Sequence, residues 1–255
     1  MSRVRPPGRG AEQRHRVRDL AEPALLLDAW DQASVAPVAG RGAVLVRLAG
    51  LCPDLDSALD LGVGECAALA TLAHLRAFGR EVAGVITCSS CGELLSAQVS
   101  LPAAEELVAA AAAGCREVAV GEFTVRAPTT RDLLAAAATP DRAYAVLLSR
   151  CVRRGDGSPV DPAQLTQEEA ALLDEAAETI TAATMTTLCV RCPACGEHVR
   201  AALDTAAVLW ERVDIAAPAL MEEVAVLARA FGWSEADLLA MPAARRAAYL
   251  ERVET

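Results

Sequence analysis

The sequence predicts an α+β fold that is mostly helical, with two β-hairpins that carry cysteine pairs at their tips and a helical C-terminal tail. The chain is 53% hydrophobic but only 3% aromatic, and alanine-rich chains of this kind favour closely packed helices. Cys88-Ser-Ser-Cys91-Gly-Glu and Cys192-Pro-Ala-Cys195-Gly-Glu repeat one pattern 104 residues apart, each between strand-like segments. From Pro218 onward, helix-starting and helix-ending residues alternate, which is typical of short helices in series.

Before the first cysteine pair, the pattern predicts three helices and one strand. Pro23 stands where a first helical residue is favoured, and Leu26, Leu27 and Trp30 follow at helical spacing. Further helices are expected at 43–48, after a break at 37–42, and at 65–78, where Gly79 ends the helix. Between them a turn is expected at 52–54, and a strand is expected at 82–87.

Between the two cysteine pairs, the sequence predicts a long insertion that is mostly helical. Helices are expected at 102–113, from 130 through Leu134, at 141–151, and after the capping box Thr166-Gln-Glu-Glu169 through Leu173 and Ile180. A hairpin is expected at 117–126 around Gly121, and 153–162 reads as a loop because of its Gly-Asp-Gly sequence. The strands next to the cysteine pairs are expected at 94–101, 185–191 and 199–203.

The C-terminal tail is expected to contain three helices. The first begins at Pro218, carries Leu220, Val224, Leu227 and Phe231 on one side, and ends at Gly232. Ser234 caps a short second helix, and Met241-Pro242 begins the last one. The expected organisation is therefore a basic arm at 1–20, a core with a helical insertion at 21–205 (cysteine knuckles at 85–101 and 185–205), and a helical segment at 206–255.

The repeated pattern predicts one structural Zn²⁺ held by Cys88, Cys91, Cys192 and Cys195, as in a zinc ribbon. Zinc prefers four soft ligands at tetrahedral corners, and two cysteines separated by two residues can supply one edge. The glycine after each second cysteine suits the sharp turn, because it adopts positive φ without steric cost. Such a metal would tie residues near 90 to residues near 195.

Other interpretations of the cysteines are weaker. A thioredoxin-like redox pair would precede a helix, whereas the residues after each pair are strand-like, and four cysteines would leave no open position for catalysis. Cys189 also forms a Cys-x-x-Cys spacing with Cys192, but it lacks the Gly-Glu that follows, so we expect a strand residue near the metal. His198 is expected on a strand surface rather than as a ligand. The isolated cysteines are expected to be buried thiols: Cys52, Cys66, Cys115 and Cys151.

Charge and composition favour some functional classes over others. The net charge of −10 disfavours general nucleic-acid binding, although six arginines make the first eighteen residues a basic arm, read either as a disordered leader or as a tether to an acidic partner. No secretory signal or run of about 20 apolar residues is present. Nine cysteines in such a chain indicate a reducing compartment and metal ligation, so a cytoplasmic location is expected.

The order of several motifs resembles a known family, the baseplate-type proteins encoded with contractile phage tails and phage-tail-like injection systems, which are similar in turn to hub-assembly proteins of T-even phages. The resemblance covers nearly everything after the basic arm. Its motifs are Phe78-Gly79 with Cys88-x-x-Cys91-Gly-Glu, Arg126-Ala-Pro-Thr-Thr-Arg-Asp-Leu-Leu134, Leu148-Ser-Arg-Cys151-Val152, Cys192-Pro-Ala-Cys195-Gly, Leu203-Asp204 with Leu209-Trp210-Glu211, Glu223-Val with Leu227-Ala-Arg-Ala-Phe-Gly-Trp-Ser-Glu235, and Met241-Pro-Ala-Ala-Arg-Arg-Ala-Ala-Tyr-Leu250.

The resemblance implies a non-enzymatic role in building or capping a tail baseplate, with other baseplate or tail proteins as partners and possible incorporation into the particle. The chain departs from the family because alanine and serine stand where bulkier core residues are expected. This difference concerns the packing of the core and leaves the cysteines of the knuckles unchanged. Half of the eight aromatic residues lie in the last fifty residues, and aromatic and arginine side chains are frequent interface anchors. They also suit packing of the tail helices. The candidate docking residues are Trp210, Phe231, Trp233, Arg245, Arg246 and Tyr249.

Two competing functions remain. A zinc-ribbon nucleic-acid or transcription module would need clustered arginines and exposed aromatic residues near the knuckles, where only Arg191 and Arg200 occur, beside Glu93 and Glu197. An enzyme, such as a hydrolase, is disfavoured because the sequence has no Gly-x-Ser-x-Gly, no His-Glu-x-x-His and no phosphate-binding glycine loop. We therefore expect no catalytic residues and no small-molecule substrate.

Overall fold

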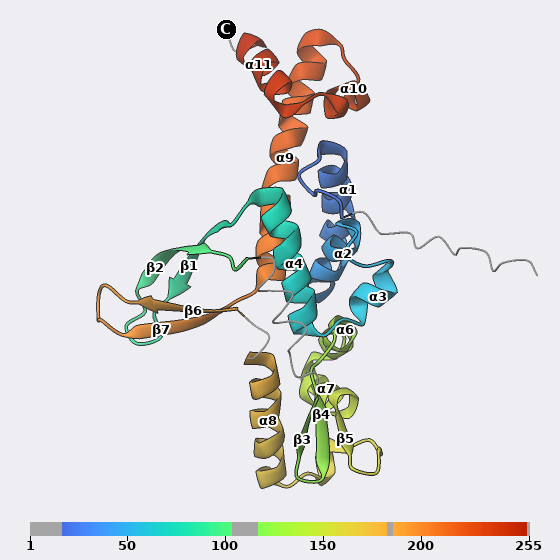
Figure 1. The fold of residues 1–255 in the computed structure, drawn as a ribbon, viewed down its shortest axis with the longest axis vertical. Helices are drawn as coiled ribbons and strands as arrows, with labels where there is room; N and C mark the ends of the chain where they lie inside the picture. Colours follow the sequence, from blue (N-terminus) through green and yellow to red (C-terminus); the bar gives the residue numbers. More distant parts are fainter. Residues whose placement is uncertain (1–16, 104–116, 183–185, 254–255) are drawn as a thin grey trace, which may run out of the picture.

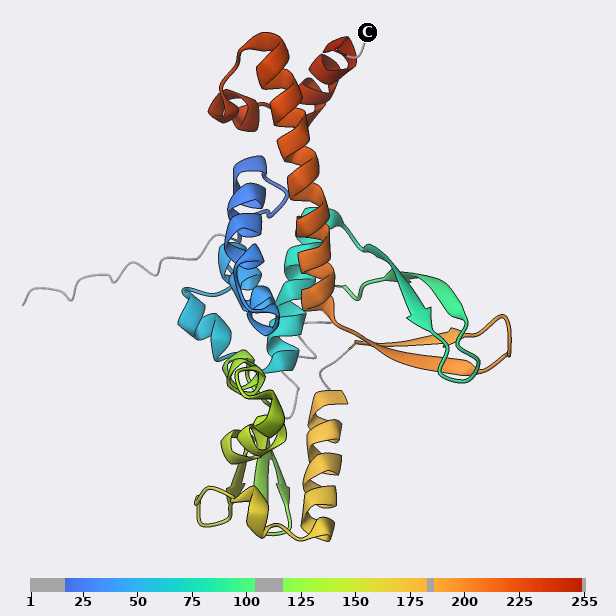
Figure 2. The same ribbon diagram turned by 180° about the vertical axis from the view of Figure 1, so that it is seen from behind.

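The computed structural model describes residues 17–103, 117–182 and 186–253, with the side chains of 181–186 left aside. It has the predicted α+β architecture (Figure 1). A helical body lies in the middle, a small mixed lobe lies at one end, the C-terminal helices lie at the other, and two hairpins project from the side (Figures 1 and 2). The basic arm and the helix expected at 102–113 fall largely outside the described residues.

The helical body is built from the first four α-helices and a long later one. Its early elements are α1 (Pro23–Ser34), the 3-10 turn η1 (Val38–Gly40), α2 (Arg41–Leu48), α3 (Leu55–Leu59) and α4 (Val63–Phe78). The three expected helices are confirmed. The short α3 is an addition, and Asp54 caps it by accepting a hydrogen bond from the Ser57 N–H.

The long helix α9 (Thr205–Phe231) corrects the prediction that a helix begins at Pro218. Pro218 lies inside α9, on its exposed side, where the missing N–H and the ring do not disturb the buried face. The buried residues continue across the proline at spacings of three and four, as Leu209, Val213, Ala217, Leu220, Val224 and Leu227. Gly232, in the left-handed conformation with φ 71°, ends the helix as expected.

The helix α9 shares one hydrophobic core with the N-terminal helices. Leu45, Leu209, Val213 and Leu227 are completely buried in it, together with alanines that allow close helix contacts. The tail helices α10 (Glu235–Ala240) and α11 (Ala243–Val253) begin after Ser234 and Pro242, as predicted, and pack on α9. Residues 205–231 are thus part of the same folded body as residues 20–78.

The small lobe contains a three-stranded antiparallel sheet in the order β3 (Glu117–Val120), β4 (Phe123–Arg126), β5 (Val152–Arg154). The helices α6 (Thr130–Ala137), α7 (Ala143–Cys151) and α8 (Gln167–Ala182) accompany it, with 3-10 turns η2 (Pro140–Arg142) and η3 (Pro162–Gln164). The expected loop at 153–162 is wrong at its start, because 153–154 pair with Phe123 and Thr124 as part of β5.

The two predicted hairpins form the remaining sheets. The first pairs β1 (Glu81–Thr87) with β2 (Leu94–Ser100), and the second pairs β6 (Thr186–Arg191) with β7 (His198–Leu203). Both reach to the same side of the helical body, so their tips lie together although the chain between them passes through the small lobe (Figure 2). Each cysteine pair therefore lies where its hairpin turns.

Ion pairs of Arg131 and a short backbone bridge join the small lobe to the helical body. Arg131 on α6 forms ion pairs with Asp56 and Asp60, at 2.9 and 2.6 Å, across the end of α3. Next to it, Gly62 and Thr129 form an isolated antiparallel bridge. None of the helices in the described ranges is both long and apolar enough to cross a membrane.

Candidate metal centre

The two cysteine turns have the same backbone geometry. In the first, the Cys88 N–H donates to the carbonyl of Glu93, and the Gly92 N–H donates to the carbonyl of Cys88, at 2.8 and 2.9 Å. The second repeats both bonds with Cys192, Glu197 and Gly196 at the same distances. Gly92 and Gly196 adopt φ of 77° and 78°, a conformation that a Cβ would strain. The shared Cys-x-x-Cys-Gly-Glu sequence therefore encodes one turn twice.

The turns bring the four predicted sulfur atoms together. The Sγ atoms of Cys88 and Cys195 lie 3.7 Å apart, as do those of Cys91 and Cys192, and all four lie within 4.8 Å of one another. A disulfide requires about 2.05 Å, so these sulfurs are not bonded. A tetrahedral ion with sulfur at about 2.3 Å separates its ligands by about 3.8 Å. Two of the sulfur–sulfur distances thus match a tetrahedral edge, and the four-cysteine cluster is compatible with a metal site.

A small hydrophobic layer lies behind the sulfurs. Cys88 and Cys192 are buried beside Leu95 and Val199, with Ile86 and Val190 packed around them. Cys91 and Cys195 are exposed at the tips. The centre is therefore closed toward the hairpins and open toward solvent, which gives an ion an access route.

Hydrogen bonds shift the pKa values of two of the thiols in opposite directions. The N–H groups of Cys91 and Ser90 lower the pKa of Cys88 to about 7, because they stabilise its thiolate. The Glu93 N–H also favours the Cys91 thiolate, but the neighbouring thiols and burial outweigh it and raise the pKa of Cys91 to about 12. Four adjacent thiolates repel one another, so full ionisation requires a cation among them.

Cys189 and His198 lie near the centre but belong to the opposite side of the second hairpin. Cys189 is exposed on β6 opposite Arg200, and His198 is exposed on β7 opposite Arg191. Neither contributes to the four-cysteine group. Period-two alternation explains this, since Val190 and Val199 on the other side face the buried layer.

Three of the isolated cysteines are buried, as expected. Burial raises the pKa of Cys66 and of Cys151 to about 11, and it also raises the pKa of Cys52. Cys115 lies outside the described residues. These thiols therefore behave as packing groups.

The candidate docking residues separate into several environments. Phe231, Trp233 and Tyr249 form one aromatic cluster, with ring centroids 4.7 to 5.5 Å apart. Arg246 is buried, donates to the Met241 carbonyl at 2.7 Å and pairs with Glu223, so it fixes α11 to α9. Arg245 is exposed. Trp210 lies apart from this cluster, on the first half of α9, beneath the guanidinium of Arg41.

Sequence reasoning missed the buried carboxylate of Asp132. It accepts hydrogen bonds from Arg126 at 2.7 Å, Arg150 at 2.6 Å and the Thr129 N–H at 2.9 Å. Burial disfavours its ionisation, but these bonds outweigh burial and hold the pKa of Asp132 well below its ordinary value. The Thr129-x-x-Asp132 capping box could have indicated the helix start, while the two arginines are brought in by tertiary structure.

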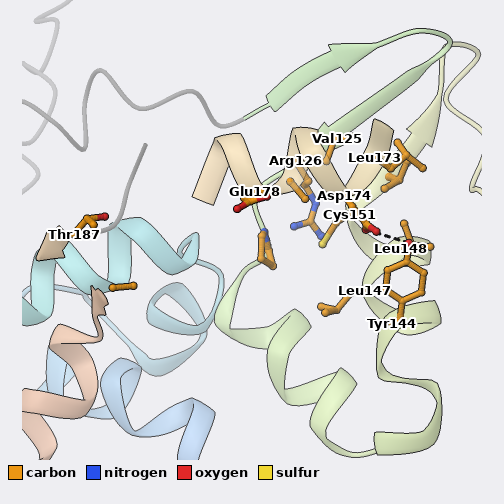
Figure 3. A pocket seen from close by; sticks show the side chains of 14 residues that line it. Val125, Arg126, Tyr144, Leu147, Leu148, Cys151, Leu173, Asp174, Glu178 and Thr187 are labelled. Carbon is orange, nitrogen blue, oxygen red and sulfur yellow. Dashed lines mark hydrogen bonds between the residues drawn. The ribbon is translucent and has the colours of Figure 1, made fainter. Parts of the chain in front are cut away.

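A largely apolar cavity of about 520 Å³ lies between the small lobe and the base of the second hairpin (Figure 3). Leu147, Leu148 and Leu173 line one side, and Thr187 lies across from them. The Tyr144 hydroxyl donates to Asp174 at 3.1 Å, which is the bond drawn in Figure 3. Arg126, the basic residue of this cavity, is already paired with Asp132.

Comparison of the chain with protein-family models, with curated proteins and with solved structures finds no match.

Proposed function

We propose that Cys88, Cys91, Cys192 and Cys195 hold one structural Zn²⁺. Two sulfur–sulfur distances of 3.7 Å, a separation of at most 4.8 Å among all four sulfurs, the all-thiol donor set and the backbone N–H groups that lower the pKa of Cys88 support this assignment. A bound zinc ion would neutralise the four thiolates and fix the two hairpin tips to each other. Four protein ligands complete a tetrahedral shell, so the ion would act as a cross-link.

We further propose that the protein is a non-enzymatic structural or assembly component of a contractile, phage-tail-like baseplate. The support is the ordered series of motifs that resembles baseplate-type proteins, and the observation that carries it is the meeting of the two cysteine pairs within that series. The cross-link would hold a projecting element rigidly on a helical body, as a scaffold protein needs (Figure 1).

Fractionation of a producing cell tests this function. The tagged chain is expected to co-sediment with intact sheathed particles or with a baseplate subassembly, and a strain lacking it should make few complete particles. A deletion from Pro218 is a poor probe, because it would remove Leu220, Val224 and Leu227 from the core. Substitution of exposed Arg245 is a gentler probe of docking by the tail. Normal particle yield without the protein would refute the proposal.

A nucleic-acid-binding ribbon is the second candidate, and one observation favours it. The strand register places Arg191 opposite His198 and Arg200 opposite Cys189 on the exposed side of the second hairpin, which makes a short basic row. The sequences of both hairpins contain no Phe, Tyr or Trp for base stacking, which argues against it. Salt-dependent retardation of single-stranded DNA that is lost in the double variant Arg191→Ala/Arg200→Ala would favour this alternative.

A further inference from the structure

Four helices begin around one apolar pocket on the helical body. The first turns of α2, α4, α6 and α9 surround a space of about 760 Å³. Most of its walls are aliphatic or aromatic, and its polar groups are few. The residues used below are Arg41, Gly42, Asp204, Ala206 and Trp210, all of which line it.

Arg41 brings an unpaired positive charge to this pocket. Its guanidinium carbon lies 4.7 Å from the centre of the Trp210 ring, in a cation–π contact. Its Nε is buried and has no hydrogen-bond partner, and no carboxylate in the described part of the chain forms an ion pair with it. A buried donor without a partner costs free energy that an incoming acceptor recovers.

Trp210, which also lines the pocket, carries an indole N–H as a further donor. The other tryptophan of the helical body, Trp30, donates its indole N–H to Asp214 at 2.8 Å. Within the described ranges, no hydrogen bond engages the indole N–H of Trp210. A guanidinium and an indole N–H next to an apolar space suit a ligand with a carboxylate beside a hydrophobic group.

The carboxylates near the pocket are already engaged. Asp204 caps α9 by accepting the Ala207 N–H at 3.0 Å, so its charge faces the positive end of a 27-residue helix. Glu65 accepts the Gly62 N–H at the start of α4, and Asp132 is held by two arginines. Neither charged residue of the lining forms an ion pair in the described ranges: the start of α9 stabilises Asp204, and Arg41 has its cation–π contact with Trp210.

The helices that carry the two donors are held tightly together. A Cβ added to Gly42 would lie 2.7 Å from the Cβ of Ala206, so α2 and α9 are in close contact at this point. The Thr205 hydroxyl donates to the Ala67 carbonyl at 2.8 Å and joins α9 to α4. Arg41 and Trp210 are thus presented by elements that are fixed relative to each other, which lowers the entropic cost of binding.

The cavity in Figure 3 provides a contrast. Its Arg126 is neutralised by Asp132, and its wall also carries Asp174 and Glu178. That cavity has no comparable positive charge to bind an anion, whereas the pocket at Arg41 has one.

We propose that the Arg41–Trp210 pocket binds a peptide segment of a partner protein in which a glutamate or aspartate is adjacent to a large apolar residue. The carboxylate would accept from Arg41 and the Trp210 N–H, and the apolar side chain would enter the aliphatic part of the pocket. This inference rests on the proposed assembly function and names the chemistry of the docking partner.

The first test uses the full chain, labelled with ¹⁵N, and two pools of acetylated hexapeptides. One pool has Glu-Leu or Glu-Phe at its centre, and the other has Gln in place of Glu. The indole signals of Trp30, Trp210 and Trp233 report the position of binding. The Glu pool is expected to shift the Trp210 signal and leave that of Trp30 unchanged, and the Gln pool should bind about 10-fold more weakly.

Variants sharpen the result. Arg41→Gln should lose binding about 10-fold or more, and Arg41→Lys should retain part of it, because lysine keeps the charge without the planar stack on Trp210. Arg47→Gln is the matched control on the same helix, since Arg47 bonds Gln32 away from this pocket. Equal binding of the two pools, an unshifted Trp210 signal at millimolar peptide, or wild-type binding by Arg41→Gln would overturn the proposal.

The second test separates this inference from the proposed function. In the producing cell, Arg41→Gln should lower the amount of the protein that co-sediments with particles, while Arg47→Gln should not. If wild-type protein co-sediments and Arg41→Gln does so equally, the pocket proposal fails and the assembly function stands. If wild-type protein never co-sediments, the assembly function fails, and the peptide measurements alone decide the chemistry of the pocket.

Discussion

The helical body and the paired hairpins are stabilised in different ways. The body buries many leucine, valine and alanine side chains from α1, α2, α4 and α9 in one continuous core. In the described part of the hairpins, few aliphatic side chains are buried: Leu95 and Val199 beside two cysteines, and Val82 and Ala97 on the first hairpin. Side chains of this size contribute at most about 1.5–3 kcal/mol each, which is little compared with the entropy lost by ordering four strands. Burial can hold the body, whereas the proposed metal cross-link would hold the hairpins.

Removal of the metal should have the largest effect. A closed zinc site is worth an apparent 10–16 kcal/mol near neutral pH, roughly the whole stability of an ordinary domain. Chelation or Cys192→Ser is expected to disorder residues 81–100 and 186–203 while the helical body stays folded. Hydrogen exchange measured along the chain checks this.

Cys189→Ser is the matched control, because Cys189 lies on the same strand but outside the four-cysteine group. It should leave metal content and exchange unchanged. Equal protection of the hairpins before and after metal removal would show that the contrast between the two regions is wrong.

Truncation in the helical core should produce the opposite pattern. Leu209 and Leu227 are completely buried on α9, so either residue changed to alanine should lower the free energy of unfolding by about 2–5 kcal/mol. Metal content of the folded protein should be unchanged. Denaturant titration with zinc analysis measures both quantities, and loss of metal from the folded variant would contradict independent stabilisation.

Removal of the Asp132 carboxylate should weaken the small lobe. Asp132→Asn leaves Arg126 and Arg150 without their anion. The free energy of unfolding should fall by about 2–3 kcal/mol, and the loss is no larger because both arginines are partly exposed to solvent. Since the folded state lowers the pKa of Asp132, its contribution is full above about pH 4 and is lost as the pH falls below that value. Urea titration of wild type and variant between pH 7 and pH 3 should show the two converging in acid. A constant difference would exclude this role.

A methyl group at Gly42 should have the smallest of these effects. Gly42→Ala places a Cβ 2.7 Å from the Ala206 Cβ, and overpacking of this kind costs about 1–3 kcal/mol, which the higher helix propensity of alanine offsets by about 1 kcal/mol. Gly40→Ala is the control, because its nearest neighbour, a methyl carbon of Leu134, would lie at an ordinary 3.6 Å. Thermal unfolding of both variants compares them, and equal melting temperatures would mean that α2 and α9 can separate slightly without cost.

The comparison also shows what the sequence could predict. The four cysteines could be found because Cys-x-x-Cys-Gly-Glu determines a local turn. Local capping likewise predicts the helix starts after Thr129 and Ser234 and the helix ends at Gly79 and Gly232. The predicted helix start at Pro218 is wrong because proline favours a first turn, whereas the apolar spacing continues through it from Leu209 to Leu227.

The parts that the sequence did not reveal depend on distant partners. Strand β5 exists because β4 pairs with it, and Val152-Arg-Arg154 alone looks like the beginning of a loop. The ion pairs of Asp132 and the pocket at Arg41 each combine residues from three or more elements. No local pattern predicts such a combination.

X-ray absorption at the zinc edge, combined with elemental analysis of freshly purified protein, tests the cross-link most directly. We predict one zinc per chain with four sulfur neighbours at about 2.3 Å, unchanged in Cys189→Ser and lost in Cys91→Ser. The proposed cross-link would be contradicted by metal-free protein whose hairpins are nonetheless ordered, or by a zinc shell that contains nitrogen or oxygen.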